Sequence, residues 1–286
     1  MWKKTLSFSG WPVGAADLRF REDGRVRTRS MVAVALVVAV VAALTVFVVQ
    51  VALRPAPGCE SSPPDTADIT VEQADNAATI AGVGLALDMP DHAVTVALAT
   101  AMQESGLRNL PAGDRDSAGL FQQRPSQGWG TYDQVTDPVH AATAFYRKLA
   151  TEPGWRDISV TEAAQLVQRS AAPQAYARWE PTARSLARAL TGETPAALAC
   201  RGITLDSPAQ DVAALAAAEL GTAHLSGPQP TARGWAIASW LVAHAARLGI
   251  DSVTFDGQAW TSDRGSWQVT GPPDGVLGLH RAADGA

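Results

Sequence analysis

One carboxylate in this sequence is placed where it could donate a proton. Glu104 ends an apolar, alanine-rich run that starts after Met89-Pro90, and Ser105 and Gly106 follow it directly. Apolar residues recur in this run at i, i+3 and i+4 spacing, which predicts a helix with Glu104 at the edge of its apolar face. A carboxyl group beside an apolar wall keeps its proton to higher pH than one in water. The pattern indicates a general acid, and the alternative is a solvated Glu at a helix C-terminus.

A second motif lies a dozen residues downstream, after a polar loop. It reads Ser117-Ala118-Gly119-Leu120-Phe121-Gln122. The Glu-Ser pair and the Gly-Leu-Phe-Gln run together resemble the lytic transglycosylases and goose-type lysozymes, whose hallmark is a Glu-Ser pair followed by Gly-Leu-Met-Gln. Phe121 replaces the Met of that pattern. The resemblance covers about residues 70–192 and implies an all-helical, lysozyme-like domain.

The resemblance implies a peptidoglycan lytic transglycosylase, which cuts the MurNAc-GlcNAc bond without a metal or other cofactor. Glu104 would protonate the leaving oxygen and then act as a base on the primary hydroxyl of the muramic acid, giving anhydro-muropeptides. Ala175-Tyr176 stands where many relatives have Ala-Tyr-Asn, so the Asn is missing. Trp129 either stacks on a sugar ring or is buried to hold its loop. The residues expected at the substrate are Ser105, Ser117, Gln122, Gln123, Trp129, Tyr146 and Tyr176.

Two other functions stay open. Asp114 or Asp116 would be the second carboxylate of a muramidase that hydrolyses the same bond, although acids in a Gly-rich loop are commonly solvated turn formers. A calcium loop from Asp114 is excluded, since its fifth and twelfth positions are Ala118 and Pro125. The five histidines show no metal-binding spacing. The third hypothesis is a non-catalytic protein that binds glycan or acts as a cell-wall scaffold. The missing Asn supports this hypothesis, and the presence of Glu104 argues against it.

The N-terminal part of the chain predicts a membrane anchor. Met31–Leu53 is a run of 23 residues without charge, long enough to span a bilayer. The alternative, a cleaved signal peptide, usually has a shorter apolar run. Residues 1–30 carry a net charge of +4, which leaves −9 for the rest of a chain whose net charge is −5. The positive-inside rule then predicts a cytoplasmic N-terminus and a catalytic domain outside the membrane. The acidic balance excludes a nucleic-acid partner.

The two cysteines bracket the segment that carries Glu104. Cys59 follows the apolar run and Cys200 lies 141 positions later. In an oxidising compartment such a pair predicts one disulfide that closes the domain. Two unpaired thiols, or Cys59 as a lipidation site, are the alternatives.

The expected architecture is mainly α. Its parts are a cytoplasmic tail (1–30), a transmembrane helix (31–53), a Pro-rich spacer (54–68), the lysozyme-like domain (69–202) and a small α/β domain (203–286). In the last part, Gly234–Ala238, Asp256-Gly257 and Trp260 resemble small domains related to D-alanyl zinc carboxypeptidases. The metal ligands of those enzymes are not visible, so this part is interpreted as a non-catalytic module that binds the wall or a protein partner of unknown kind.

Capping signals predict where the helices begin and end. Thr70 with Gln73 and Ser159 with Glu162 form capping boxes, and Asp91, Asp137-Pro138 and Ser207-Pro208 mark other starts. Further helices are expected over 173–190, interrupted at Pro181, and over 234–248. Segments 252–255, 259–261 and 266–270 predict a small antiparallel meander.

Overall fold

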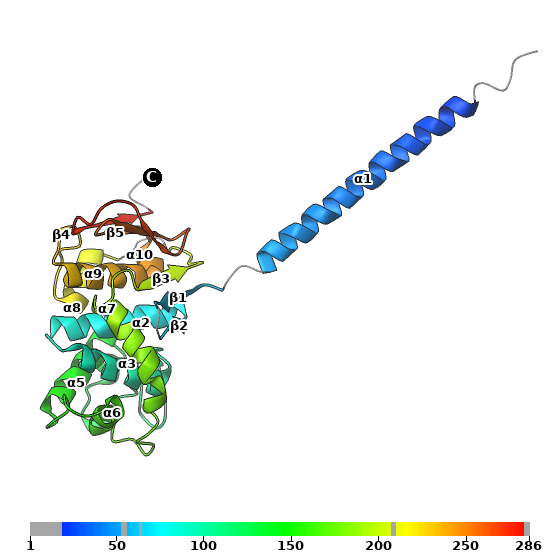
Figure 1. The fold of residues 1–286 in the computed structure, drawn as a ribbon. Helices are drawn as coiled ribbons and strands as arrows, with labels where there is room; N and C mark the ends of the chain where they lie inside the picture. Colours follow the sequence, from blue (N-terminus) through cyan, green and yellow to red (C-terminus); the bar gives the residue numbers. More distant parts are fainter. Residues whose placement is uncertain (1–18, 53–55, 63–64, 207–209, 283–286) are drawn as a thin grey trace, which may run out of the picture. The chain divides into compact units, whose positions relative to one another are not determined.

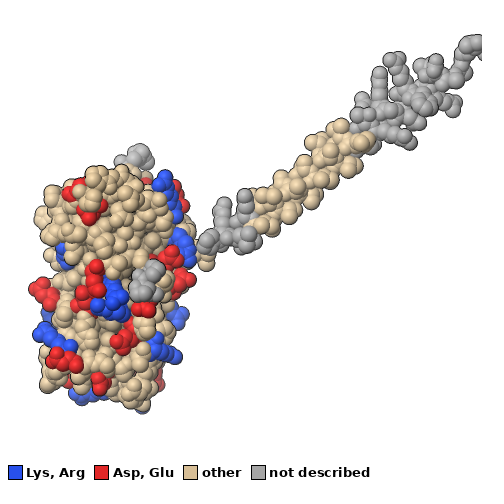
Figure 2. Space-filling model, viewed as in Figure 1, with Lys and Arg blue, Asp and Glu red and all other residues tan. Residues whose placement is uncertain are grey.

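The computed structural model describes residues 19–52, 56–62, 65–206 and 210–282, which form two compact units, Met1–Pro55 and Ala56–Ala286. The first unit contains helix α1 (Arg19–Ala52). Within it, Met31–Val49 is long and apolar enough to cross a membrane, as an anchor or as a signal sequence. Figure 2 shows this segment without charged side chains. Most of the predicted cytoplasmic tail (1–30) lies outside the described residues, and so does Leu53, the last residue of the predicted transmembrane helix.

Five helices build the part of the second unit that contains Glu104. Helix α3 (Asp91–Ser105) lies among them, and its residues from Ala93 to Met102 are buried. It packs against α2 (Val71–Ala86), α5 (Pro138–Thr151), α6 (Val160–Gln168) and α7 (Glu180–Leu190). The many alanines of α3 allow this close packing, because small side chains let helix backbones approach. Both predicted capping boxes and the Asp137 cap are confirmed.

A three-stranded sheet carries the disulfide. Strand β1 (Gly58–Ser61) pairs with both β2 (Asp68–Ile69) and β3 (Leu198–Arg201). Cys59 lies opposite Cys200 in the β1–β3 register, and the two form the predicted disulfide. The structure therefore differs from the expected spacer over 54–68, since Cys59 is fully buried. The local composition of residues 54–68 does not reveal this strand, because its partner strand β3 is distant in sequence.

A five-stranded antiparallel sheet lies at the C-terminal end, in the order β4-β8-β5-β6-β7. Helix α9 (Thr231–Ala243) covers it, and Gly234 permits the contact, because a Cβ there would lie 2.0 Å from Cζ of Phe255. The other elements of this part are α8 (Val212–Leu220), β4 (Gly227–Pro228), α10 (Ala245–Leu248), β5 (Ile250–Phe255), β6 (Gln258–Thr261), β7 (Trp267–Val269) and β8 (Val276–Arg281).

The second unit is layered. Figure 1 shows the five-stranded sheet, then α9 and α10, then α2, and then the helices around α3. Helix α2 contacts α8 and α9, and α7 contacts α9, so buried residues before and after residue 202 share one core. The architecture is helices with two small sheets, a mixed fold rather than the mainly α fold expected from the sequence.

Several boundaries differ from those predicted. Pro181 lies in the first turn of α7 and starts that helix, because the first turn needs no N–H from proline. Asp91 is the first residue of α3 after a Pro90 cap, not the cap itself. The helix expected over 234–248 breaks at His244 into α9 and α10. Ser207-Pro208 lies outside the described residues, and Asp211 caps α8. Short α4 (Tyr132–Val135) and strand β8 have no counterpart among the predicted elements.

A buried ionic cluster joins α2 to the C-terminal helices. His244 is fully buried, with Nδ1 bonded to the Asp75 carboxylate and Nε2 3.0 Å from Oε2 of Glu219. Arg247 donates to Asp75 at 2.9 Å, and the Trp240 indole donates to Glu219 at 2.8 Å. Each buried charge therefore has a partner of opposite sign, as burial requires.

Loss of the disulfide is expected to lower the free energy of unfolding of residues 56–286 by roughly 3 kcal/mol, since the crosslink restricts the unfolded chain. Urea unfolding of the protein with and without a reductant measures the change. The double variant Cys59→Ser/Cys200→Ser serves as the control, because reductant should not affect it. Equal midpoints for the oxidised and reduced protein would contradict the expectation.

The stability of residues 56–286 is expected to fall as the pH rises from about 6.5 to about 9. Burial alone lowers the pKa of His244, but the carboxylates of Asp75 and Glu219 outweigh it and raise the pKa to about 9. A histidine whose pKa is higher in the folded state than in the unfolded state stabilises the fold fully at pH values below its unfolded-state pKa. This stabilisation is lost as the pH rises through the folded-state pKa. Urea unfolding across this range should show a loss of roughly 3 kcal/mol.

Two variants separate this cluster from other histidines. His244→Gln should remove most of the pH dependence, although it also lowers stability at every pH. His280→Gln should leave the slope unchanged, because His280 is exposed on β8 and pairs only with Asp251 at 2.7 Å. A flat stability profile in the unmodified protein would rule out a charged His244.

Candidate active site

Glu104 occupies the last turn of α3, where the helix stops abruptly. Gly106 adopts the left-handed conformation (φ 64°) and donates its N–H to Met102, and Leu107 donates to Ala101 at 3.1 Å. Glycine suits this position because it has no Cβ to clash. The abrupt end leaves Glu104 half-buried at the edge of the helical core.

Two polar side chains lie near the Glu104 carboxylate. The Tyr176 hydroxyl donates to Oε1 of Glu104 at 2.9 Å, and the polar side chain of Gln168 lies nearby. Burial raises the pKa of the Glu104 carboxyl above its ordinary value, and these two polar neighbours offset part of the rise. A carboxyl group with a raised pKa is suited to give up a proton to a leaving group and to take one back.

Tyr176 is brought to Glu104 by tertiary structure. It lies just before the short helix η2 (Ala177–Trp179) and is fully buried. Arg178 and Trp179 both donate to Oε1 of Gln103, at 3.1 Å and 3.0 Å, which holds this segment against the end of α3. Burial, followed by the nearby Glu104 charge, raises the pKa of Tyr176, so its hydroxyl remains a donor.

Ser105 connects the helix end to the second motif. It is buried, and its Oγ lies 2.8 Å from the carbonyl oxygen of Leu120 and 3.0 Å from that of Ala101. Its hydroxyl is therefore occupied by backbone partners. Ser105 positions α3 against the loop and does not face the pocket described below.

The polar groups of the second motif are engaged within their own loop. Gln122 has a left-handed backbone (φ 49°), its Oε1 accepts from Ser117 at 3.0 Å, and its Nε2 donates to Gly119 at 3.1 Å. Gly113 is needed beside this amide, because a Cβ there would lie 1.6 Å from Oε1 of Gln122. Ser117 and Gln122 thus hold the loop in shape, and neither hydrogen-bonds to Glu104.

Two further predicted residues lie in the core. Gln123 is buried and donates to the carbonyl of Ala141 at 3.1 Å. Tyr146 is fully buried, and its hydroxyl donates to the carbonyl of Ile80 at 3.0 Å. Both tie α5 to its neighbours, so their place is structural and not at a substrate surface.

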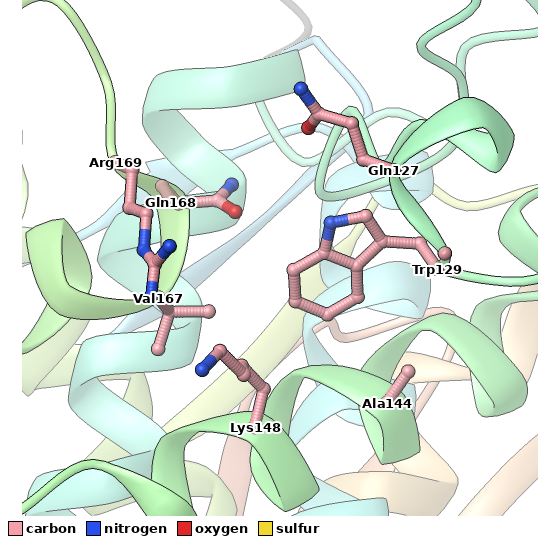
Figure 3. A pocket seen from close by; sticks show the side chains of 8 residues that line it. Gln127, Trp129, Ala144, Lys148, Val167, Gln168 and Arg169 are labelled. Carbon is pink, nitrogen blue, oxygen red and sulfur yellow. The ribbon is translucent and has the colours of Figure 1, made fainter.

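An open pocket of about 560 Å³ is lined by Gln168 but not by Glu104 or Tyr176. Gln168 is therefore the residue that links this pocket to the surroundings of the Glu104 carboxyl group. Gln168 ends α6, donates to the carbonyl of Phe121 at 2.9 Å and also lines the pocket. Trp129, which is half-buried, forms the opposite wall (Figure 3). The lining residues are Gln127, Gly128, Trp129, Ala144, Lys148, Val167, Gln168 and Arg169.

Of the residues predicted to contact substrate, Trp129 lines this pocket and Tyr176 reaches Glu104. Gln168, Lys148 and Arg169 are absent from the sequence-based set. Gln168 had one usable signal, since it ends a clearly capped helix shortly before Ala175-Tyr176. Lys148 and Arg169 had none, because their place in the pocket depends on how α5 and α6 pack.

The two loop aspartates lie outside the pocket lining. Asp114 is exposed and close to Arg115, at 3.8 Å. Asp116 accepts from the backbone N–H of Ser126 at 2.8 Å and from Nε of Arg124 at 2.7 Å. The Ser126 bonds first, and then Arg124, hold the pKa of Asp116 well below its usual range. Asp116 thereby fastens the loop that presents Trp129.

No described residue that lines the pocket is acidic. Among the described residues, no group of three or more His, Cys, Asp or Glu side chains is arranged to hold a metal ion. The chemistry available at this site is therefore that of one carboxyl group, a tyrosine hydroxyl and an amide beside an aromatic wall.

Comparison with known families finds a similarity in the C-terminal part. The family described as "VldE, C-terminal domain" matches residues 177–275, from the residue after Tyr176 to just before β8. The match crosses residue 202, where the sequence predicts a domain boundary, and does not include Glu104. No curated protein matches the chain. Over about a third of its length the chain is thus similar to that family.

Proposed function

We propose that this chain is a membrane-anchored enzyme that cleaves peptidoglycan glycan strands, with Glu104 as its general acid and base. The observation that carries the proposal is the setting of Glu104: a half-buried carboxyl group with a raised pKa, hydrogen-bonded by Tyr176 and close to Gln168, which lines an open pocket with an aromatic wall. An indole face suits the C–H edges of a sugar ring. The resemblance of the Glu-Ser and Gly-Leu-Phe-Gln motifs to lytic transglycosylases agrees with this setting.

The proposed reaction uses one carboxyl group twice. Glu104 gives its proton to the glycosidic oxygen as the bond from C1 of MurNAc to O4 of GlcNAc breaks. The Glu104 carboxylate then takes the proton of the C6 hydroxyl of the same MurNAc, and O6 bonds to C1 to form the anhydro ring. Glu104 ends protonated, and no water is consumed. The Tyr176 hydrogen bond stabilises the carboxylate between the two steps.

The contacts of Asp116 and the exposed position of Asp114 favour this reaction over hydrolysis. A muramidase needs a second carboxylate near the scissile bond. Asp116 is engaged by Ser126 and Arg124, and Asp114 is exposed. Either would have to leave its present contacts to serve the pocket.

We also propose that residues after the apolar helix lie outside the cytoplasmic membrane and that the N-terminus lies in the cytoplasm. The net charge of +4 before residue 31 supports this orientation. The Cys59–Cys200 disulfide supports an oxidising compartment for the second unit. The anchor would hold the site near the wall glycan.

Glu104→Gln is expected to lower release of anhydro-muropeptides from isolated peptidoglycan by roughly 100-fold or more, because an amide cannot donate the proton. Mass spectrometry of the products, with the full-length chain in a mild detergent, measures this loss. Glu72→Gln is the matched control, since Glu72 is exposed in the first turn of α2. Reducing-end products would instead identify a hydrolase, and glycan binding without release would identify a binding protein.

Tyr176→Phe is expected to move the descending limb of the pH–rate profile to higher pH. Removal of this donor leaves the Glu104 carboxylate less stabilised, so its pKa rises further. Tyr146→Phe is the control, because it also removes a buried hydroxyl but one that bonds to Ile80. If both variants shift the limb equally, Tyr176 has no specific effect on Glu104.

A further inference from the structure

The pocket that Gln168 lines contains two cations that the proposed reaction does not use. Lys148 projects from α5 and Arg169 follows the last residue of α6, and both line the pocket. Figure 3 shows their side chains on the side of the pocket that faces the Trp129 ring. The rest of the chain after residue 30 carries a net charge of −9, so this pocket differs in sign from the unit that contains it.

The two cations differ in how free they are. Lys148 is paired with Glu152 on its own helix, and the Glu152 side chain is largely buried. Arg169 is exposed and forms no ion pair within the described part of the chain. A guanidinium group has a planar set of donors that matches a carboxylate. Arg169 is therefore the group available to bind an anion.

The backbone at Arg169 is also unusual. Its φ of 50° and ψ of 40° lie in the left-handed region, which glycine favours and which is costly for arginine. Its N–H donates to the carbonyl of Gln165 at 2.9 Å, which closes the helix at this point. Because the chain turns here, Arg169 lines the pocket directly after Gln168, which lies near Glu104.

We propose that Arg169, assisted by Lys148, forms a carboxylate subsite that selects glycans bearing an anionic substituent on the sugar next to Trp129. This inference rests on the proposed function and names its substrate class. In a wall glycan the carboxylate comes either from a free lactyl group on a strand without peptides or from the stem peptide. Neutral glycans would stack on Trp129 but leave Arg169 without a partner, so they would bind more weakly.

The test compares three substrates: strands without peptides, the same strands with their lactyl carboxylates converted to amides, and strands with peptides. Binding is measured by calorimetry at low salt with full-length Glu104→Gln protein in detergent, so the result does not depend on turnover. We expect at least one carboxylate-bearing substrate to bind roughly 10-fold more tightly than the amidated strands, a preference that added salt weakens. The substrate that shows the preference identifies the source of the carboxylate.

Arg169→Gln, made in the same background, should lose this preference while binding amidated strands as before. Arg169→Gly should behave alike and fold at least as well, since glycine suits the left-handed backbone. Arg156→Gln is the matched control, because Arg156 is exposed and stacks on Trp155 outside the pocket lining. Equal binding of all three substrates, or an equal loss on all three in Arg169→Gln, would overturn the subsite. If the protein prefers carboxylate-bearing strands but the unmodified chain cleaves none of the substrates, only the proposed enzymatic activity is overturned.

Discussion

The burial of helix α3 is the constraint on which the site depends. Four helices pack around it, so the residues from Ala93 to Met102 are buried. A helix enclosed in this way can present a charged side chain to solvent only near its ends. Glu104 lies at the C-terminal end, and it keeps part of the apolar surround of the helix. The same packing that stabilises the fold thus sets the proton affinity of the carboxyl group.

The hydrogen bonds around this helix end divide into two kinds. Ser105, Ser117 and Gln122 bond to backbone or to each other and hold the loop against α3. Tyr176 bonds to Glu104 itself, and Gln168 lies near the carboxylate. The Ser117–Gln122 motif, which resembles an active-site signature, therefore chiefly holds the loop in its conformation. The polar groups near the Glu104 carboxylate come from segments further along the chain.

The C-terminal part contributes to the support of this core. Helix α9 lies between the five-stranded sheet and α2, and His244 links it to α2 through Asp75. Helix α7, which follows Tyr176 and η2, packs on both α3 and α9. The region similar to the VldE C-terminal family begins within this arrangement, at residue 177. A contribution to the stability of the helical core is thus one structural role of the C-terminal sheet and its helices.

The sequence by itself determined the features that depend on near neighbours. Capping boxes, the apolar helix, the helix that ends beside Glu104 and the paired cysteines were all readable, because each follows from residue types a few positions apart or from a simple count. It did not indicate that Gln123 and Tyr146 are buried, and it missed strand β1, the break at His244 and the pocket residues Gln168 and Arg169. Only the tertiary structure decided these, since burial and pocket lining depend on which distant segments pack together, and a local pattern contains no information on that packing.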